Sequence, residues 1–404
     1  MTDFDRFFSR GARAMQPSPI RRMAGLINQP GVISFAGGVP NPATFPDADL
    51  KRIMDDIVET DGYQIFQYGV TRGLEAFRQQ LVTMLAGRGI RAADEGLMVT
   101  SGSQQGLELL SRVLLDPGDV VLVELPSYIG ALACFRNTLA EMVGVAQDAD
   151  GIVPEELERT IIALRSAGRT IKLLYVIPNF QNPSGITITP ARRAAVLELA
   201  RAHGLLVVED DPYGELYFPG VAPESLRAMR ALSGGEDVVY LSSFSKVVSP
   251  GLRTAFMAAP PPVIRMLELA KQAADLCTSS LDQRLVYEYC KRGLYDRHLA
   301  EVRRFYAAKC EAMLAALDRH MPAEIAWTRP RGGMFVWLTL PAGLDAEPLA
   351  VEAVQTLKVA FIHGAPFFVN GAGRNTLRLT FAKEDAAKIE EGIRLLAGFF
   401  KSKL

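Results

Sequence analysis

One lysine of the chain lies among hydroxyl side chains directly after an apolar run. Lys246 belongs to the segment Ser242-Ser243-Phe244-Ser245-Lys246, which follows Val238–Leu241, and Arg253 comes shortly afterwards. Hydroxyl and guanidinium groups together can bind an anion such as phosphate. A lysine that lies near cations and away from water loses proton affinity and becomes nucleophilic. For any single lysine, the alternative is a solvated side chain in a surface turn.

Two more polar clusters follow apolar runs. Ser101-Gly102-Ser103-Gln104 precedes a helical stretch, and its backbone N–H groups can bind phosphate or simply cap the helix. The pattern is not GxGxxG, which disfavours a nicotinamide site. Glu209-Asp210-Asp211 follows Leu205–Val208. Such carboxylates can cap a helix, bind a metal or keep a heterocyclic nitrogen protonated, and the lack of other nearby ligands disfavours the metal.

The elements that position these clusters alternate between helix and strand. Apolar spacing predicts helices at 49–57, 73–85, 104–114 and 190–203, and short apolar runs predict strands at 97–100, 120–123, 173–177, 205–208 and 238–241. Runs of this kind suit a mostly parallel sheet buried on both faces by crossover helices. Ligands of open α/β sheets bind beyond the carboxyl ends of the strands, where the polar clusters lie.

The pattern changes after about residue 280. Helices are predicted at 281–292, 297–320 and 384–400, and strands at 332–337 and 376–380, which is typical of a smaller α+β domain. We therefore divide the chain into an N-terminal arm and substrate-loop segment (1–48), a large α/β domain (49–295) and a small C-terminal domain (296–404). The arm is expected to pack on either domain.

Composition excludes several classes of protein. The 404 residues carry a formal net charge of -1, which gives no support for nucleic-acid binding. No apolar run is long enough to cross a bilayer, and the first residues lack the apolar core of a signal peptide. The four cysteines and four histidines are scattered without the spacing of metal ligands. We expect a cytoplasmic protein without a metal site.

Taken together, these features resemble the fold-type I enzymes that use pyridoxal 5'-phosphate (PLP), specifically the class I/II aminotransferases. Ser-x-Ser-Lys followed by Pro-Gly-Leu-Arg, at 243–253, matches the family's lysine segment, and the likeness extends from Ser18 to Phe381. The runs 18–21 and 33–40 point to the aminoadipate, kynurenine and aromatic or branched-chain aminotransferases. The resemblance implies an aspartate aminotransferase-like fold with PLP as cofactor.

The resemblance also implies roles at the cofactor ring. Lys246 would form the Schiff base with PLP, and Asp210 would pair with the pyridinium nitrogen and keep it protonated. Tyr213 and Asn182 would donate hydrogen bonds to the ring's 3-oxygen. Tyr128 would stack on the ring face; taken alone, it would be a core tyrosine.

The phosphate would have two sets of partners in the family pattern. The first comprises the backbone N–H groups of Ser103 and Gln104 and the side chains of Ser243, Ser245 and Arg253. The second is Tyr68, which would reach the phosphate of the neighbouring subunit, so that the active site would need a homodimer. A buried turn residue is the alternative for Tyr68.

The resemblance implies a further set of residues that would hold the substrate. Arg378 matches the arginine that binds the α-carboxylate, with Asn182 beside it, and Gly38 would let the backbone approach the same group. Arg21 would meet a distal carboxylate or carbonyl of the substrate. Arg22 stands where relatives usually have an acidic residue, so the side-chain specificity is left open.

The implied reaction is ping-pong transamination with Lys246 as general base. An L-amino acid would donate its amino group, and a 2-oxo acid such as 2-oxoglutarate or pyruvate would accept it. Two alternatives stay open: another PLP reaction on the same fold, such as β-elimination or decarboxylation, and a PLP-sensing transcription regulator. A simple binding or scaffold role would not need this set of residues.

Overall fold

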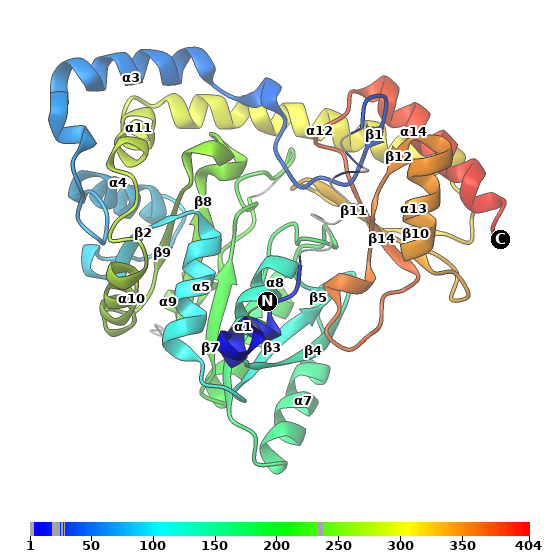
Figure 1. Cartoon of the computed structure of the whole chain (residues 1–404), viewed down its shortest axis with the longest axis horizontal. Coiled ribbons are helices and arrows are strands. Elements are labelled where there is room, and N and C mark those ends of the chain that lie inside the picture. Colours follow the sequence, from blue (N-terminus) through cyan, green and yellow to red (C-terminus); the bar gives the residue numbers. More distant parts are fainter. Residues whose placement is uncertain (1–3, 18–24, 26, 28, 221, 233–236) are drawn as a thin grey trace.

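A large sheet occupies the centre of the computed structural model, which describes residues 4–17, 25, 27, 29–220, 222–232 and 237–404 (Figure 1). Its strand order is β2-β9-β8-β7-β6-β3-β4-β5. The strands are β2 (Leu97–Ser101), β3 (Val120–Leu125), β4 (Glu141–Asp148), β5 (Gly151–Ile152), β6 (Ile171–Val176), β7 (Leu206–Asp210), β8 (Val238–Ser243) and β9 (Thr254–Ala258). β3, β4, β6, β7 and β8 run parallel, whereas β5 and β9 are antiparallel to their neighbours.

Alternate residues of the parallel strands enter two separate cores. Val121 and Val123 of β3 belong to the core on one face, and Val120 and Leu122 belong to the core on the other. Because side chains alternate along a strand, a continuous apolar run fills both faces at once. The helices of this part are α4 (Glu75–Ala86), α5 (Ser103–Leu114), α6 (Ile129–Asn137), α7 (Pro154–Ser166), α8 (Pro190–Ala202), α9 (Leu226–Leu232), α10 (Pro261–Ala274) and α11 (Ser280–Lys291).

The predicted strands and helices of this part are all present, and several unpredicted ones join them. β9 lies between β2 and β8 and is antiparallel to both. Its sequence, Thr254-Ala255-Phe256-Met257-Ala258, has few β-branched residues, so it gives little strand signal. The expected aspartate aminotransferase-like arrangement, a mostly parallel sheet flanked by helices, is confirmed.

The C-terminal part has its own sheet and helices (Figure 1, right). The sheet order is β10-β11-β14-β13, with antiparallel pairing throughout. The strands are β10 (Ala326–Trp327), β11 (Phe335–Thr339), β13 (Ile362–His363) and β14 (Thr376–Thr380), and the helices are α12 (Leu294–His320), α13 (Ala346–Leu357) and α14 (Ala386–Lys401). The expected smaller α+β part is therefore present, and the division at residues 48 and 295 stays our prediction.

The N-terminal arm touches both parts of the molecule. β1 (Ile33–Ser34) pairs in parallel with β12 (Val359–Ala360) of the C-terminal part. Farther upstream, α1 (Arg10–Ala14) packs against α6 of the large sheet. α3 (Asp47–Asp61) then follows the arm and packs on α11. The loop between β1 and α3 therefore lies where the two parts meet. Within the described residues, no helix combines the length and apolarity that a membrane span requires.

Candidate active site

Polar side chains gather at the carboxyl ends of neighbouring strands. Ser101 ends β2, Asp210 ends β7 and Ser243 ends β8, and the segment 177–189 follows β6. β7 lies between β6 and β8, and β8 is joined to β2 through β9. Because these strands point the same way, their ends meet at one edge of the sheet, which is where a ligand is expected.

Lys246 reaches from the end of β8 toward the N-terminal arm. It lies in a short 3-10 helix, Phe244–Lys246, directly after the strand. Its Nζ donates a hydrogen bond to the backbone oxygen of Gly38 at 3.0 Å. Burial and the nearby charges of Arg378 and Arg253 lower the pKa of Lys246 to about 8. A large fraction of its amine is therefore neutral near pH 8, as a nucleophile or base requires.

Asp210 is a buried carboxylate in which one oxygen accepts a hydrogen bond and the other does not. Its Oδ2 accepts a hydrogen bond from the Tyr175 hydroxyl at 2.7 Å, and its Oδ1 is buried without a hydrogen-bond partner. Burial raises the pKa of Asp210 to about 7, while the hydrogen bond from Tyr175 opposes this rise. A cationic N–H donor at Oδ1 would relieve the desolvation of the charged form.

Tyr213, Asn182 and Arg378 form a chain of contacts across the site. Asn182 donates from Nδ2 to the Tyr213 hydroxyl at 3.5 Å, a long contact, and its Oδ1 accepts from Arg378 at 2.7 Å. The Tyr213 ring centroid lies 5.9 Å from the Nζ of Lys246. Asn182 therefore links the side of the site built by the large sheet to the side built by the C-terminal part.

Arg378 is fully enclosed, although its charge would favour water. It lies on β14, stacks 4.3 Å from the Phe335 ring centroid and donates to the backbone oxygen of Ala36 at 2.8 Å. Its Nε is buried without a hydrogen-bond partner, and burial lowers the pKa of Arg378 to about 10. A carboxylate ligand would offset this desolvation. Gly38 lies beside it, where an added Cβ would come within 3.1 Å of Phe335 Cζ.

A turn and an arginine form an anion cradle at the end of β2. Gly102 has φ of 83°, and a Cβ there would lie 2.1 Å from a terminal nitrogen of Arg253. Glycine is therefore needed both for the turn and for the approach of Arg253. Ser103 and Gln104 begin α5, so their N–H groups are among those that lack a partner within the helix.

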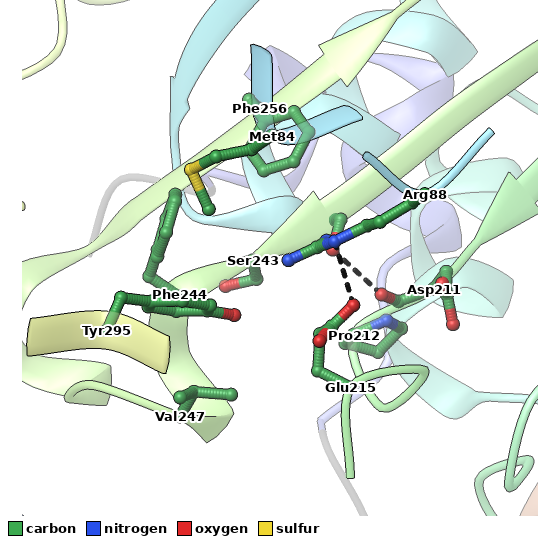
Figure 2. Close-up of a pocket in the computed structure, with 11 residues that line it drawn as sticks. Met84, Arg88, Asp211, Pro212, Glu215, Ser243, Phe244, Val247, Phe256 and Tyr295 are labelled. Atoms are coloured by element: carbon green, nitrogen blue, oxygen red, sulfur yellow. Dashed lines mark hydrogen bonds and ion pairs between the residues drawn. The ribbon is translucent and has the colours of Figure 1, made fainter. Parts of the chain in front are cut away.

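The serines at and after the end of β8 lie on a well-packed segment. Ser243 donates from its hydroxyl to that of Ser245 at 2.9 Å and also accepts from the backbone N–H of Ser245. Figure 2 shows the Phe244 and Tyr295 side chains beside Ser243, with Arg88 pointing toward Glu215 nearby. The Phe244 and Tyr295 rings meet edge to face, and Arg88 forms an ion pair with Glu215 at 2.9 Å. The packing of Phe244 limits the freedom of the loop that carries Lys246.

Tyr128 stands over the start of α5. Its hydroxyl donates to Oε1 of Gln104 at 3.3 Å, and Gln104 donates from Nε2 to the backbone oxygen of Gly130 at 2.9 Å. An added Cβ at Gly130 would lie 2.4 Å from Cζ of Tyr128, so only glycine lets the ring fold back here. The ring is thereby placed beside the anion cradle, in a position to cover a planar ligand.

The family assignment rests on most of the chain. The family "Aminotransferase class I and II" matches residues 32–396. The chain belongs to this family. The expected likeness to aromatic, aminoadipate and kynurenine enzymes is also confirmed. The chain is 40% identical over 403 residues to an aromatic-amino-acid aminotransferase of Thermococcus litoralis, covering 100% of this chain and 96% of that protein.

Solved structures of other aminotransferases superpose closely. A kynurenine aminotransferase of Pyrococcus horikoshii, in complex with PMP, has a TM-score of 0.95 and 40% identity, covering 100% of this chain and 98% of that one. LysN, an alpha-aminoadipate aminotransferase of Thermus thermophilus complexed with N-(5'-phosphopyridoxyl)-L-leucine, has a TM-score of 0.91 and 41% identity, covering 99% of each chain. An aspartate aminotransferase of Thermus thermophilus, at 22% identity and TM-score 0.83 over 97% of this chain and 99% of that one, shares the fold.

One predicted site residue, Tyr68, lies apart from this group within its own chain, and another, Arg21, lies outside the described residues. Tyr68 is 79% exposed and lies on a loop after the 3-10 helix Gly62–Phe66, so it faces outward from its own chain. Its assignment to a neighbouring subunit stays a prediction. Arg21 lies outside the described residues, as do Ser18 and Arg22, so the predicted contact with the distal end of the substrate stays a prediction as well.

Tyr175 is a residue of the site that the sequence reasoning missed. Its run, Leu173-Leu174-Tyr175-Val176-Ile177, was interpreted only as a buried strand. The one available signal was a hydroxyl within an otherwise apolar strand, since a buried tyrosine usually finds a partner for its O–H group. The partner is Asp210, on the neighbouring strand.

A second missed group holds the loop that carries Asn182. Arg193 is buried and donates to Oδ1 of Asn179 at 2.6 Å and to the backbone oxygens of Ile188 and Pro178. Asn179 in turn donates to Asp211 at 2.8 Å. Because these bonds satisfy the polar groups inside the loop, they fix the position from which Asn182 reaches Arg378.

Proposed function

We propose that this aminotransferase uses PLP to move an amino group from an L-amino acid to a 2-oxo acid such as 2-oxoglutarate, in a ping-pong reaction. The donor would be of the 2-aminoadipate, aromatic or branched-chain type. The observation that carries the proposal is the convergence of Lys246, the free oxygen of Asp210 and the enclosed Arg378 in one site. These supply a nucleophilic amine, an anion for a ring nitrogen and a carboxylate anchor.

The residues present fit PLP at the ring nitrogen. Oδ1 of Asp210 is buried without a partner, and the carboxylate has its pKa raised to about 7 by burial. A pyridinium N–H would satisfy this oxygen and supply a compensating charge. Without such a partner, the desolvated carboxylate of Asp210 would lower the free energy of unfolding.

The residues also fit the phosphate end. The N–H groups at the start of α5, the Arg253 guanidinium and the hydroxyls of Ser243 and Ser245 offer donors to a phosphate, while Gly102 leaves room for the approach. Phosphates are commonly held at helix N-termini of this kind. Tyr128, folded back over Gly130, would cover the ring.

Bound PLP supplies an electron sink that stabilises negative charge at the substrate Cα. Lys246 would hold the cofactor covalently, and its free amine would accept the proton from the substrate Cα. Its pKa of about 8 suits a group that must accept and release a proton near neutrality. Gly38 accepts a hydrogen bond from the same Nζ and so helps to aim it.

Arg378 sets the geometry of the reaction. With a terminal nitrogen held by the backbone oxygen of Ala36 and the other by Asn182, its plane is fixed before a substrate arrives. Binding of the α-carboxylate to this guanidinium would orient the Cα–H bond toward Lys246. Asn182 and Tyr213 would hydrogen-bond the ring's 3-oxygen from the same side.

Two experiments test this function. Purified protein should show the visible absorbance of bound PLP, and borohydride reduction should fix the cofactor on Lys246, as read by peptide mass spectrometry. Incubation with a panel of L-amino acids and 2-oxoglutarate should yield the matching 2-oxo acids, with 2-aminoadipate, aromatic or branched-chain donors preferred. Protein that cannot be loaded with PLP would refute the proposal, and release of ammonia or amine in place of an oxo acid would indicate lyase or decarboxylase chemistry.

A further inference from the structure

An ion pair between the enclosed Lys271 and the partly exposed Asp275 contacts Ser101 and Gln105, which flank the Gly102 turn, and it has no part in the proposed reaction. We propose that Lys271, with Asp275 and Gln105, is a positioning group for the phosphate end of PLP. Together, Lys271, Asp275 and Gln105 form a hydrogen-bonded group, the clip. The proposal rests on the proposed function, because it concerns how the same cofactor site is held.

Lys271 is enclosed and fully hydrogen-bonded. Its side chain is 0% exposed although it lies on α10, and its Nζ donates to both carboxylate oxygens of Asp275, at 2.8 and 2.9 Å, and to Oε1 of Gln105 at 2.7 Å. Burial lowers the pKa of Lys271, and the hydrogen bond and charge of Asp275 oppose this. An enclosed ammonium group is stable only with such partners.

Gln105 links the Lys271–Asp275 pair to Ser101 at the edge of the anion cradle. It belongs to the first turn of α5, donates from Nε2 to Asp275 at 2.5 Å and accepts on Oε1 from the backbone N–H of Ser101 at 2.8 Å. The Ser101 hydroxyl lies 3.1 Å from Asp275, and its backbone oxygen accepts from Arg253 at 3.4 Å. Ser101 is therefore held by the clip on one side and meets Arg253 on the other.

Charge balance gives the clip a second effect. The Asp275 carboxylate accepts a hydrogen bond from the hydroxyl of Ser101, the residue directly before Gly102 in the sequence. It therefore lies close to the turn. Left unpaired there, its negative charge would repel a phosphate dianion and oppose the field of the helix N-terminus. Lys271 cancels that charge without itself entering the cradle, so the cradle keeps its affinity for anions.

Stability alone does not account for the clip. Enclosing the Lys271 ammonium group carries a desolvation cost, and its ion pair with the partly exposed Asp275 adds little stability beyond offsetting that cost. The alternative is a pair that only fastens α10 to α5. The two roles differ in what they predict for ligands, because only a positioning role distinguishes a cofactor with a phosphate from one without.

The experiment measures dissociation constants of the apoenzyme for PLP and for pyridoxal, which lacks the phosphate. Lys271→Met should weaken PLP binding about tenfold or more, because it leaves the Asp275 carboxylate without its cation and Gln105 without one of its three side-chain hydrogen bonds, and should change pyridoxal binding little. The matched control is Lys51→Met. Lys51 pairs with Asp55 at the same helical spacing, but its side chain is 77% exposed and it lies on α3. It should change neither constant.

Two further variants complete the test. Adding Asp275→Asn to Lys271→Met should restore part of the PLP affinity, because the unpaired charge is removed. Gln105→Leu removes the hydrogen bonds of the Gln105 side chain to Ser101 and to the ion pair without changing charge. It should also raise the dissociation constant for PLP and leave that for pyridoxal unchanged. This variant tests the proposal if Lys271→Met yields no folded protein. Equal losses for both ligands, or no loss for either, would overturn the clip alone. Wild-type protein that binds no PLP would instead overturn the proposed function and the clip together.

Discussion

The site has two halves that are built in different ways. The half proposed to hold the cofactor, called the cofactor half, consists of Asp210, Lys246, Arg253 and the Gly102–Ser103 turn, all at one edge of the large sheet. The half proposed to hold the substrate, called the substrate half, consists of Gly38, Asn182 and Arg378, which come from the N-terminal arm, a loop after β6 and a strand of the C-terminal part.

The difference shows how one fold can keep its chemistry and vary its substrate. Strand ends within a single sheet are fixed by the ladder of backbone hydrogen bonds, so the cofactor half is rigid by construction. The substrate half depends on contacts between segments, such as Arg378 with Ala36 and Asn182. We expect changes in the arm outside Gly38, whose backbone oxygen contacts Lys246, to alter what is bound while Lys246 and Asp210 stay in place.

The largest expected effect is in the cofactor half. Lys246→Ala should lower the rate of transamination at least about a thousandfold, because it removes the group that moves the Cα proton. The cradle and Asp210 remain, so PLP should still bind without a covalent link. Steady-state kinetics and equilibrium dialysis measure the two quantities. Near-normal turnover would remove Lys246 from its role, and recovery of rate with added primary amines would support it.

A smaller but still large effect is expected in the substrate half. Arg378→Lys should lower kcat/KM for amino acids about a hundredfold, because a lysine cannot hold a carboxylate in two parallel hydrogen bonds and leaves Asn182 and Ala36 poorly paired. The dissociation constant for PLP should stay nearly unchanged, which separates the two halves.

A matched control for this change lies at the start of the same region. Arg374 precedes β14, pairs with Asp345 at 2.5 Å and has a side chain that is 73% exposed. Arg374→Lys should leave kcat/KM as it is, since an exposed ion pair contributes little. If Arg378→Lys weakened PLP binding as much as it lowered kcat/KM, the two halves would not be separable.

The sequence predicts the cofactor half better than the substrate half for a physical reason. Apolar runs that end in polar clusters mark strand ends locally, and the order of parallel strands then brings Asp210 and Lys246 together. No such local rule joins β1 to β12, which are two-residue strands far apart in the chain. Gly38 and Arg378 were assigned through the family resemblance, and only the fold explains how they meet.

Burial is the second property that the sequence does not reveal. Lys51 and Lys271 each precede an aspartate by four residues on a helix, and the local patterns look alike. Lys51 is solvated, whereas Lys271 is enclosed because α10 packs against α5. Tyr175 was missed for the same reason, since a tyrosine in a strand looks like any core residue until its neighbour is known.

Tyr175 offers a moderate test within the cofactor half. Its hydrogen bond opposes the rise in the pKa of Asp210, so Tyr175→Phe should raise that pKa further. Protonated Asp210 cannot pair with a cationic ring nitrogen. The acid limb of the pH profile of kcat/KM should therefore move to higher pH, with about a fivefold loss of kcat/KM near neutral pH that narrows as pH rises.

The control for that test is another enclosed tyrosine. Tyr289, on α11, is buried and its hydroxyl has no hydrogen-bond partner, so Tyr289→Phe should leave the pH profile in place. A Tyr175→Phe enzyme that lost rate equally at all pH values would indicate a packing role only. The hydroxyl of Tyr175 would then not belong to the cofactor half.

The smallest expected effect is at Tyr68, and it tests whether the cofactor half is built from one chain or from two. If Tyr68 reaches the phosphate of a neighbouring subunit, Tyr68→Phe should weaken PLP binding about threefold, through loss of one solvent-accessible hydrogen bond, and leave pyridoxal binding unchanged. Tyr63→Phe is the control, because Tyr63 lies on the same surface segment and is 83% exposed. An unchanged PLP constant would mean that each chain completes its own phosphate site, so that the rigid half of the site needs no partner. A selective loss would mean that even this half depends on assembly, and that only the ring contacts of Asp210 and Lys246 come from a single sheet.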